Sequence, residues 1–236
     1  MHRRIIGALL GAGALAAVSV TTATLLGQTT APAGAHDTGT AALRAEATHP
    51  PTATASAPAP DPLDLAPAEQ AVSYDFQYQP NFYYCGPAST RIALTSNGIS
   101  MSQDEVARRL GTTVNGTNSA DNATHVLNAA LGKDEYQTHW IPGQRADGEQ
   151  AERLQRDVVA AVTSGRAVVA NIVGGATDVG GTYHEFGGGH FVTIVAYRDH
   201  GRQVQIADPS GMFGPRTYWM ATYPMANWVA SRGYSA

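Results

Sequence analysis

The sequence predicts an α+β domain in which a group of helices precedes an antiparallel sheet. Helical spacing of apolar residues, with helix start and stop signals, falls mainly between residues 85 and 165. Alternating apolar and polar residues on both sides of a polar turn fall between residues 190 and 208. Helices in one run and strands in another are typical of α+β domains, whereas a doubly wound sheet alternates the two.

The folded region opens with "VSYDFQYQPNFYY", whose aromatic and β-forming residues predict a short strand followed by a loop. A helix is predicted over Cys85–Ser96, because Pro87 suits the first turn and "NG" at residues 97–98 suits the end. Three residues of this helix fall on one face at helical spacing: Ala88, Ile92 and Thr95.

Three further helices are predicted before residue 166. "SQDE" at residues 102–105 is a capping box that opens a helix ending at Gly111, and "SADNATHVLNAALG" is a helix ending at Gly132. "GEQAERLQRDVVAAVTSG" is a helix that stops at Gly165. Its apolar residues recur at helical spacing: Leu154, Val158, Val159 and Val162. "YQTHWI" alternates like a strand, and "AVVANIV" is predicted to be a buried strand.

The last part of the chain is rich in strand signals. "HFVTIVAYRDHGRQVQIAD" contains two alternating runs around a polar turn with Gly201, which predicts a hairpin. "GPRTYWMATY" predicts another strand, and "MANWVASRG" predicts a closing helical turn. If the turn is centred near Asp199, His190 lies directly opposite Asp208, and one apolar face of the hairpin ends in this pair.

The region before the domain divides into two parts. Residues 1–35 combine a basic start, "MHRR", with a long apolar run and "AGA" at the end, which predicts a cleaved secretory signal peptide. An uncleaved membrane anchor is the alternative, because the run is long enough to span a bilayer. Residues 36–70 are dense in Pro, Ala and Thr, so we expect a disordered linker. The domain is then predicted to occupy residues 71–236, and the protein to be secreted and possibly associated with the cell wall.

Charge and composition limit the kinds of partner that the protein can have. The formal net charge is −4, and the basic residues are scattered rather than gathered into a patch. This pattern predicts neither a nucleic-acid surface nor a stable membrane contact after signal cleavage. We expect a monomer that needs no cofactor and no metal.

The chain contains a single cysteine, Cys85, in "YYCGPAS". One cysteine cannot form an internal disulfide, and exported thiols are exposed to oxidation. Unpaired N–H groups at a helix N-terminus lower the pKa of a thiol, and a nearby imidazolium lowers it further. The sequence therefore predicts a nucleophile, with Gly86 allowing a substrate backbone to come close. A small buried apolar cysteine is the alternative.

His190 is the best candidate for the partner imidazole. "GGGHFVTIVAY" places it at the mouth of an apolar strand, after glycines that allow close approach. The other histidines of the domain lie in a helix, in strands or loops without this context, or in the hairpin turn: His125, His139, His184 and His200.

Asp208 and Gln79 complete the predicted site. A carboxylate opposite His190 can hold the imidazole tautomer and stabilise its charged form, although "DPSG" is also good turn sequence. Gln79 lies six residues before Cys85, and its amide could join the Cys85 backbone N–H in stabilising an oxyanion. A surface glutamine is the alternative, and Gln77 is a rival for the role.

The motifs "Q-x5-CGPAS", "GGHFVTIVAY" and "ADPSG", in this order, resemble those of the papain-like cysteine peptidases. The sequence is most similar to the bacteriocin-leader (double-glycine) peptidase-like group, family thirty-nine of the cysteine peptidases, in its stand-alone form. The resemblance covers Ser73 to about Met212. The leader-cleaving members are usually fused to a membrane ABC transporter, which this sequence lacks, so cleavage after a double-glycine leader is not assumed.

The resemblance implies a fold in which a helical lobe carries the cysteine and an antiparallel sheet carries the histidine and the aspartate. It also implies that Cys85 is the nucleophile, His190 the general base, Asp208 the orienting residue and Gln79 the oxyanion-hole donor. The expected activity is hydrolysis of peptide or related amide bonds in a peptide or protein substrate.

Two other functions stay open at this point. An inactive cell-wall or peptide-binding module could use aromatic residues near the C-terminus as a groove: Tyr218, Trp219, Tyr223 and Trp228. A metallohydrolase could use "HEFGGGH", but His184 and His190 are six apart and do not share a helix face as H-E-x-x-H ligands do.

Overall fold

The computed structural model describes residues 62–211 and 216–236. Its helices are α1 Pro62–Leu65, α2 Cys85–Ser96, α3 Gln103–Leu110, α4 Ala120–Leu131, α5 Gly148–Thr163 and α6 Thr222–Val229. Its strands are β1 Gln70–Ala71, β2 Thr138–His139, β3 Val168–Thr177, β4 Tyr183–Arg198, β5 Gln203–Ala207, β6 Thr217–Ala221 and β7 Tyr234–Ser235. The predicted signal peptide and most of the predicted linker lie outside the described residues.

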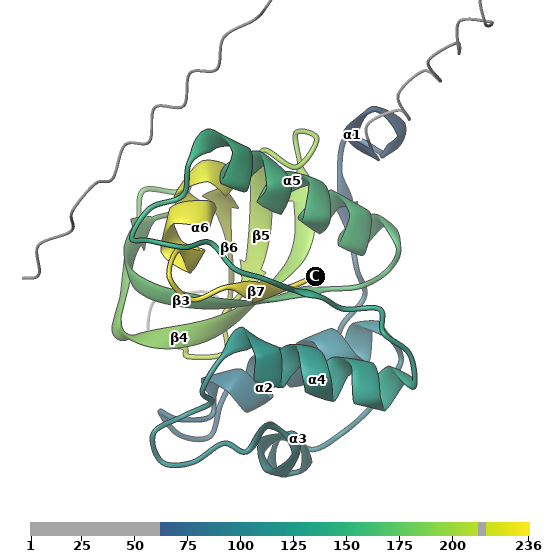
Figure 1. Cartoon of the computed structure of the whole chain (residues 1–236), viewed down its shortest axis with the longest axis vertical. Helices are drawn as coiled ribbons and strands as arrows, with labels where there is room; N and C mark the ends of the chain where they lie inside the picture. The colour runs from purple at the N-terminus through teal and green to yellow at the C-terminus, as the bar shows by residue number, and fades with distance from the viewer. Residues whose placement is uncertain (1–61, 212–215) are drawn as a thin grey trace, which may run out of the picture. The chain divides into compact units, whose positions relative to one another are not determined.

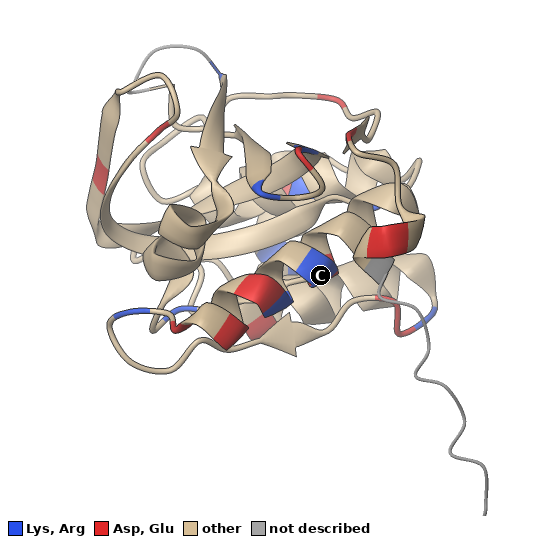
Figure 2. Cartoon of the chain, turned by 90° about the horizontal axis from the view of Figure 1, so that it is seen from above, with Lys and Arg blue, Asp and Glu red and all other residues tan. Residues whose placement is uncertain are grey.

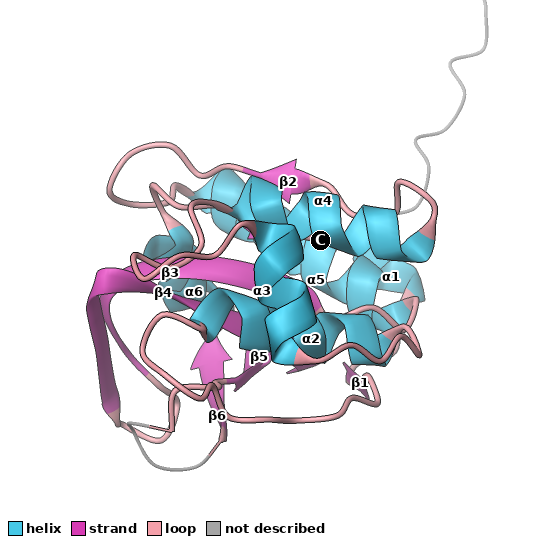
Figure 3. Ribbon diagram, turned by 90° about the horizontal axis from the view of Figure 1, so that it is seen from below, coloured by secondary structure: helices cyan, strands magenta, loops and turns pink. Residues whose placement is uncertain are grey.

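All strand pairs in the described part of the chain are antiparallel and belong to one sheet of order β2-β7-β3-β4-β5-β6, with β1 paired to β4. Helices α2, α3 and α4 gather below the sheet in Figure 1, whereas α5 and α6 lie against its upper part. Figure 3 shows the same helical group from below, with α2 and α3 in front of β3, β4 and β5. The predicted α+β class is confirmed, with a helical group followed by an antiparallel sheet.

The helix boundaries follow the local signals in the sequence. Helix α2 has the predicted limits, and Ser102 caps α3 by accepting a hydrogen bond from the Glu105 N–H at 3.2 Å. Gly111 and Gly132 end α3 and α4 in the left-handed conformation, which glycine adopts without steric cost. These local interactions involve neighbours in sequence, so a short window of residues contains the information that sets them.

Two segments at the start of the domain differ from expectation. Part of the predicted linker contacts the sheet: β1 pairs with β4, and the Tyr197 hydroxyl donates to the Pro67 carbonyl at 3.0 Å. The strand expected after Ala71 does not form over residues 72–79, although the Val72 N–H donates to the Val195 carbonyl at 2.9 Å. The β1–β4 pairing joins segments more than a hundred residues apart, so no local pattern reveals it.

Helix α2 is buried on all sides rather than on one face. All ten residues from Cys85 to Leu94 are buried, whereas Thr95 is only half-buried. Two reciprocal hydrogen bonds join the helix to the sheet. The Ser89 hydroxyl donates to the Phe191 carbonyl at 2.8 Å, and the Thr193 hydroxyl donates to the Ser89 carbonyl at 2.9 Å. Because Cys85 lies one turn before Ser89, these bonds hold its side chain beside the strand that carries His190.

The β4–β5 turn packs tightly on α5 through Gly201. This glycine has φ +82°, and a Cβ there would lie 2.6 Å from the Val159 side chain. We expect Gly201→Ala to lower the free energy of unfolding by about 2–4 kcal/mol, since backbone strain and overpacking add. Gly132→Ala is the matched control, because φ is +69° there but the space around a Cβ is empty. Urea unfolding of both variants measures the difference, and equal losses would show that packing on α5 contributes nothing.

Charged residues of both signs are interspersed over the face shown in Figure 2, most densely along α5. Arg153 and Arg156 lie there at helical spacing from Asp157 and Glu152, respectively. Within residues 62–211 and 216–236, no helix has the length and apolar character needed to cross a membrane.

Candidate active site

Cys85 is the first residue of α2, as the sequence predicted. The helix has no side-chain N-cap and no acidic residue in its first turn, so its first N–H groups face the thiol without competition. The side chain is only 8% exposed, but it lines a cavity rather than being enclosed by hydrocarbon. This placement beside a cavity favours the predicted nucleophile over an inert core cysteine.

The structure brings His190 and Asp208 together through a register that differs from the predicted one. The turn lies later than Asp199, because Arg198 pairs with Gln203. A β-bulge between Ile194 and Ala196 then shifts the pairing so that Ile194 faces Ile206. The bulge adds one residue to β4, so His190 and Asp208 lie on the same face of the hairpin, as predicted. They are diagonal neighbours on that face instead of direct partners. His190 Nε2 lies 2.9 Å from Asp208 Oδ1.

The imidazole lies between the thiol and the carboxylate. Its Nε2 contacts Asp208, and the ring lies close enough to Cys85 to lower the pKa of the thiol; with Nε2 engaged, Nδ1 is the nitrogen available to the sulfur. His190 and Asp208 are each 4% exposed. The order sulfur, imidazole, carboxylate is that of a nucleophile, a base and an orienting group.

The charges of these three groups support one another. Burial raises the pKa of Cys85, but the hydrogen bond and charge of His190 and the Phe191 and Gly86 N–H groups outweigh it, so the thiol pKa is below its ordinary value. Burial lowers the pKa of His190, but hydrogen bonds to Asp208 and Cys85 outweigh it and raise that pKa to about 9. Both shifts favour the thiolate–imidazolium form of the pair.

Asp208 is held by three donors. Besides the imidazole, its Oδ1 accepts from the Ser210 N–H at 2.8 Å, and its Oδ2 accepts from the Tyr218 hydroxyl at 3.1 Å. Burial raises the pKa of Asp208, but the hydrogen bond and charge of His190 and the bonds to Ser210 outweigh it and hold that pKa below its usual value. Asp208 is therefore more than a turn former, because its carboxylate binds the Ser210 N–H of the turn and the His190 imidazole.

Aromatic rings pack around the His190–Asp208 pair and limit the orientation of the imidazole. Phe186 stacks on His190 with ring centroids 4.0 Å apart, and His184 stacks on Tyr218 at the same distance. His184 Nε2 lies 2.9 Å from Asp178 Oδ2. Sequence reasoning missed Tyr218 as a support of Asp208. Knowledge of the β5–β6 register, in which Ile206 pairs with Tyr218, would have placed Tyr218 close to Asp208.

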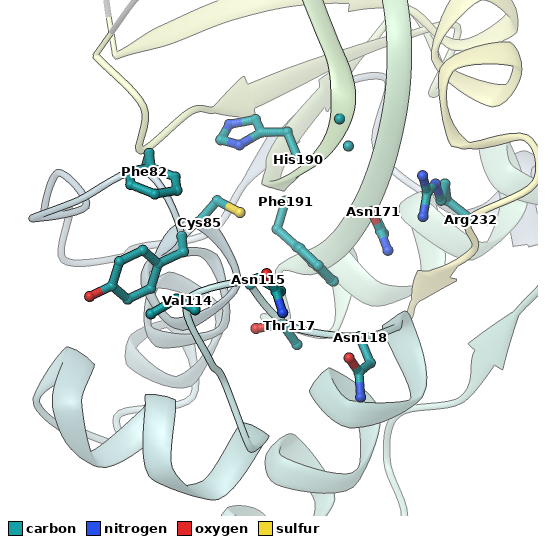
Figure 4. Close-up of a pocket in the computed structure, with 14 residues that line it drawn as sticks. Phe82, Cys85, Val114, Asn115, Thr117, Asn118, Asn171, His190, Phe191 and Arg232 are labelled. Atoms are coloured by element: carbon teal, nitrogen blue, oxygen red, sulfur yellow. The ribbon is translucent and has the colours of Figure 1, made fainter. Parts of the chain in front are cut away.

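A cavity of about 420 Å³ opens beside the thiol. Figure 4 shows Cys85 and His190 at one side of it and Asn171 and Arg232 at the other, with Phe191 between. The remaining wall comes mainly from the loop after α3: Val114, Asn115, Gly116, Thr117 and Asn118. Sequence reasoning did not find Asn171 or Arg232, because neither belongs to a motif.

Gly86 serves a different purpose from the one predicted. A Cβ at this position would overlap the Thr117 side chain, whose hydroxyl also lies 2.8 Å from the Thr112 hydroxyl. The glycine therefore makes room for the loop that forms the cavity wall, rather than for a substrate backbone.

Gln79 is near the site, but its side chain does not line the cavity. Its backbone N–H donates to the Pro209 carbonyl at 2.9 Å, which ties it to the strand end that carries Asp208. Its side-chain amide donates to the Asn81 carbonyl at 2.7 Å. The rival Gln77 is exposed and contacts Gln103 on α3, so Gln79 is the better placed of the two. Its oxyanion role stays a prediction.

The other candidate residues lie apart from this arrangement. His125 and His200 are exposed, and His139 contacts Arg153 on α5. No group of three or more His, Cys, Asp or Glu side chains in the described ranges is arranged to hold a metal ion. The suggested aromatic groove is wrong, because Tyr218 and Trp228 are buried whereas Tyr223 is 54% exposed.

Replacing Asp208 by asparagine tests the imidazole–carboxylate contact. The change removes the negative charge that helps to raise the pKa of His190 to about 9 and replaces one acceptor oxygen with an amide donor. We therefore expect the pKa of His190 to fall, so that the alkaline limit of thiolate–imidazolium pairing moves to lower pH. The NMR titration profile of the His190 imidazole measures this shift. Tyr218→Phe keeps the carboxylate and should move the profile less; an unchanged profile in Asp208→Asn would contradict the arrangement.

A thiol on a helix N-terminus, an imidazole from a β-strand and a carboxylate that orients it together define the class of thiol-dependent hydrolases. The sequence model of the Peptidase_C39 like family matches residues 69–236, and the chain belongs to that family. It is therefore a cysteine peptidase by family, as the motifs around Cys85, His190 and Asp208 indicated.

Three solved structures are similar to the chain. The peptidase domain of Streptococcus ComA, a bifunctional ABC transporter, is 16% identical, with 69% of this chain and 96% of that chain covered and a TM-score of 0.44. A putative C39-like peptidase from Bacillus anthracis is 13% identical, with 71% and 96% covered and a TM-score of 0.48. Xylellain, a cysteine protease from Xylella fastidiosa, is 14% identical, with 76% and 89% covered and a TM-score of 0.48. No curated protein gives a significant match.

Proposed function

We propose that the protein is a secreted cysteine peptidase that hydrolyses peptide bonds through a Cys85 acyl-enzyme. The observation that carries this proposal is that Cys85 and His190 line one cavity of about 420 Å³, with His190 hydrogen-bonded to Asp208. The thiolate attacks the peptide carbonyl, and the imidazolium donates its proton to the leaving amine. Water, deprotonated by the neutral imidazole, then attacks the thioester and releases the acid.

Stabilisation of the tetrahedral oxyanion is assigned to the start of α2. The N–H of the first residue of a helix has no partner within the helix. The Cys85 backbone N–H can therefore donate to the oxyanion that forms when the Cys85 sulfur attacks. Gln79 is the second proposed donor, through the amide hydrogen that is not used by the Asn81 carbonyl. Secretion rests on the signal-like residues 1–35 and is proposed on the sequence alone.

Incubation with a complex mixture of natural peptides tests the activity directly. Mass spectrometry should detect new termini that appear with time and that disappear after alkylation of the protein by iodoacetamide. The chain has one thiol, so the site of alkylation is unambiguous. Peptides that bind but are never cleaved would instead indicate a binding module built on the same fold.

A further inference from the structure

The cavity beside Cys85 is asymmetric in charge. Apart from His190, Arg232 is the one basic side chain among the residues that line it, and no lining residue is Asp or Glu. The rest of the polar lining consists of neutral amide and hydroxyl side chains: Asn115, Thr117, Asn118, Asn171 and Tyr83. Such a cavity favours a ligand group with negative charge.

The backbone holds Arg232 firmly at this wall. The residue lies between α6 and β7, and its N–H donates to the Val229 carbonyl at 2.9 Å. The next carbonyl, that of Gly233, accepts from the Asn171 N–H at 3.1 Å. The segment on the other side is fixed as well, because the Ser231 N–H donates to the Ile141 carbonyl at 2.7 Å. The backbone that carries Arg232 is therefore fixed by the fold.

The guanidinium reaches the strand that carries the imidazole. A Cβ placed on Gly189 would lie 3.6 Å from Arg232 Nη2, so a side chain at that position would contact the cation. The absence of a side chain at Gly188 and Gly189 leaves the approach from His190 to Arg232 open along this wall of the cavity.

Neither Arg232 nor the Asn171 side chain is satisfied by the protein. Within residues 62–211 and 216–236, no ion pair and no side-chain hydrogen bond includes Arg232. Asn171 is only 4% exposed and lines the cavity, yet its amide has no hydrogen-bond partner in the same part of the chain. The Asn171 amide is not among the fully buried polar atoms of the described residues, so it is accessible from the cavity and free to bind a ligand group.

We propose that Arg232 and Asn171 form a subsite for a carboxylate of the substrate, so that the enzyme selects peptides with a negative charge close to the bond that is cleaved. The inference rests on the proposed peptidase function. The planar fork of a guanidinium matches the two oxygens of a carboxylate, and the Asn171 amide supplies a further donor. Carboxylates are the anions that unmodified peptides carry, either on Asp and Glu side chains or at the C-terminus.

The size of the cavity limits the position of that carboxylate. A volume of about 420 Å³ corresponds to a width of roughly 9 Å if the cavity is treated as a sphere, which an extended chain crosses in about two or three residues. Figure 4 places Cys85 and Arg232 on opposite sides of this space. The charged group therefore belongs to a residue one or two positions from the scissile bond.

Thiol-reactive peptides test the subsite without requiring turnover. Iodoacetyl-Gly-Glu-amide and its Gln counterpart extend from the sulfur in one direction, and acetyl-Glu-Gly and acetyl-Gln-Gly chloromethyl ketones extend in the other. Iodoacetyl-Gly-Gly, as free acid and as amide, reports recognition of a C-terminal carboxylate. In each reaction the Cys85 sulfur forms a carbon–sulfur bond and the halide leaves. Rates are divided by the rate with iodoacetamide, which corrects for thiol reactivity in each variant.

We expect one carboxylate probe to react about tenfold faster than its amide counterpart, since a charge-assisted bidentate contact is stronger than a neutral one. The pair that shows the preference identifies the direction and the source of the carboxylate. Arg232→Gln should bring the ratio close to one, and Arg232→Lys should keep part of it. Arg145→Gln is the matched control, because Arg145 is exposed and does not line the cavity.

Equal rates for every pair in the natural protein, or a preference that survives in Arg232→Gln, would overturn the subsite. Labelling with a clear carboxylate preference, but without cleavage of any peptide, would leave the subsite standing and would contradict the peptidase function. Cleavage of acidic and neutral peptides at equal rates, without a preference in labelling, would support the peptidase function and contradict the subsite.

Discussion

Cys85→Ala is expected to abolish peptide hydrolysis while leaving the protein folded. The thiolate is the only nucleophile in the proposed mechanism, so the loss should reach about 10⁴-fold or more, down to the background of the assay. The side chain is small and lines a cavity, so the variant should unfold within about 1 kcal/mol of the natural protein. Mass spectrometry of peptide digests and urea unfolding measure the two effects.

Cys85→Ser extends the test to the chemistry of the nucleophile. A hydroxyl keeps the shape of the side chain, but its pKa is far above that of a thiol, so His190 cannot hold it as an anion. We expect this variant to be nearly as inactive as Cys85→Ala. Substantial hydrolysis by either variant would show that another group performs the reaction, and an unfolded Cys85→Ala protein would be distinguished from an inactive one by its unfolding curve.

Much of the site was accessible from the sequence because each part has a local signature. Cys85 precedes Gly-Pro at a helix start, and His190 follows three glycines at the start of an apolar strand. The facing of His190 and Asp208 was inferred from alternation alone, yet the assumed turn was wrong. A bulge near Val195 compensated for it, and bulges have no dependable sequence signal. The correct face was therefore reached through an incorrect register.

The parts that sequence reasoning missed depend on contacts between distant segments. Asn171 and Arg232 meet only because β7 adds to the sheet beside β3, and β7 is two residues long. Thr117 reaches Gly86 only because the loop after α3 folds back over the start of α2. Neither contact follows from periodicity or capping, since nothing within a short window of either residue refers to the other.

His190→Ala should separate activation of the thiol from delivery of the proton. Burial is the largest influence on the Cys85 thiol and raises its pKa, and it is outweighed mainly by the hydrogen bond and charge of His190. Without the imidazole, the pKa of Cys85 should rise above its ordinary value. At pH 7 the rate of alkylation by iodoacetamide should then fall about tenfold to a hundredfold, because the smaller thiolate fraction is partly offset by greater nucleophilicity.

Peptide hydrolysis should fall further than alkylation in the same variant, because the leaving amine also loses its proton donor. General acid catalysis contributes about 10²–10⁴-fold, so the combined loss should exceed the loss in alkylation by roughly this factor. His125→Ala, on the exposed surface of α4, is the control for a histidine substitution. If hydrolysis and alkylation fall by the same factor, His190 activates the thiol but another group protonates the amine.

The pH dependence of the natural protein follows from the same two groups. Hydrolysis should decline at low pH as Cys85 is protonated, and because the pKa of Cys85 is lowered, this limit lies below that of an ordinary thiol. It should decline again at high pH as His190, with its pKa raised to about 9, loses the proton that the leaving amine needs. Alkylation needs only the thiolate, so it should show the acid limit without the alkaline loss. A shared alkaline decline would mean that deprotonation of His190 disturbs the site itself, rather than only removing the proton donor.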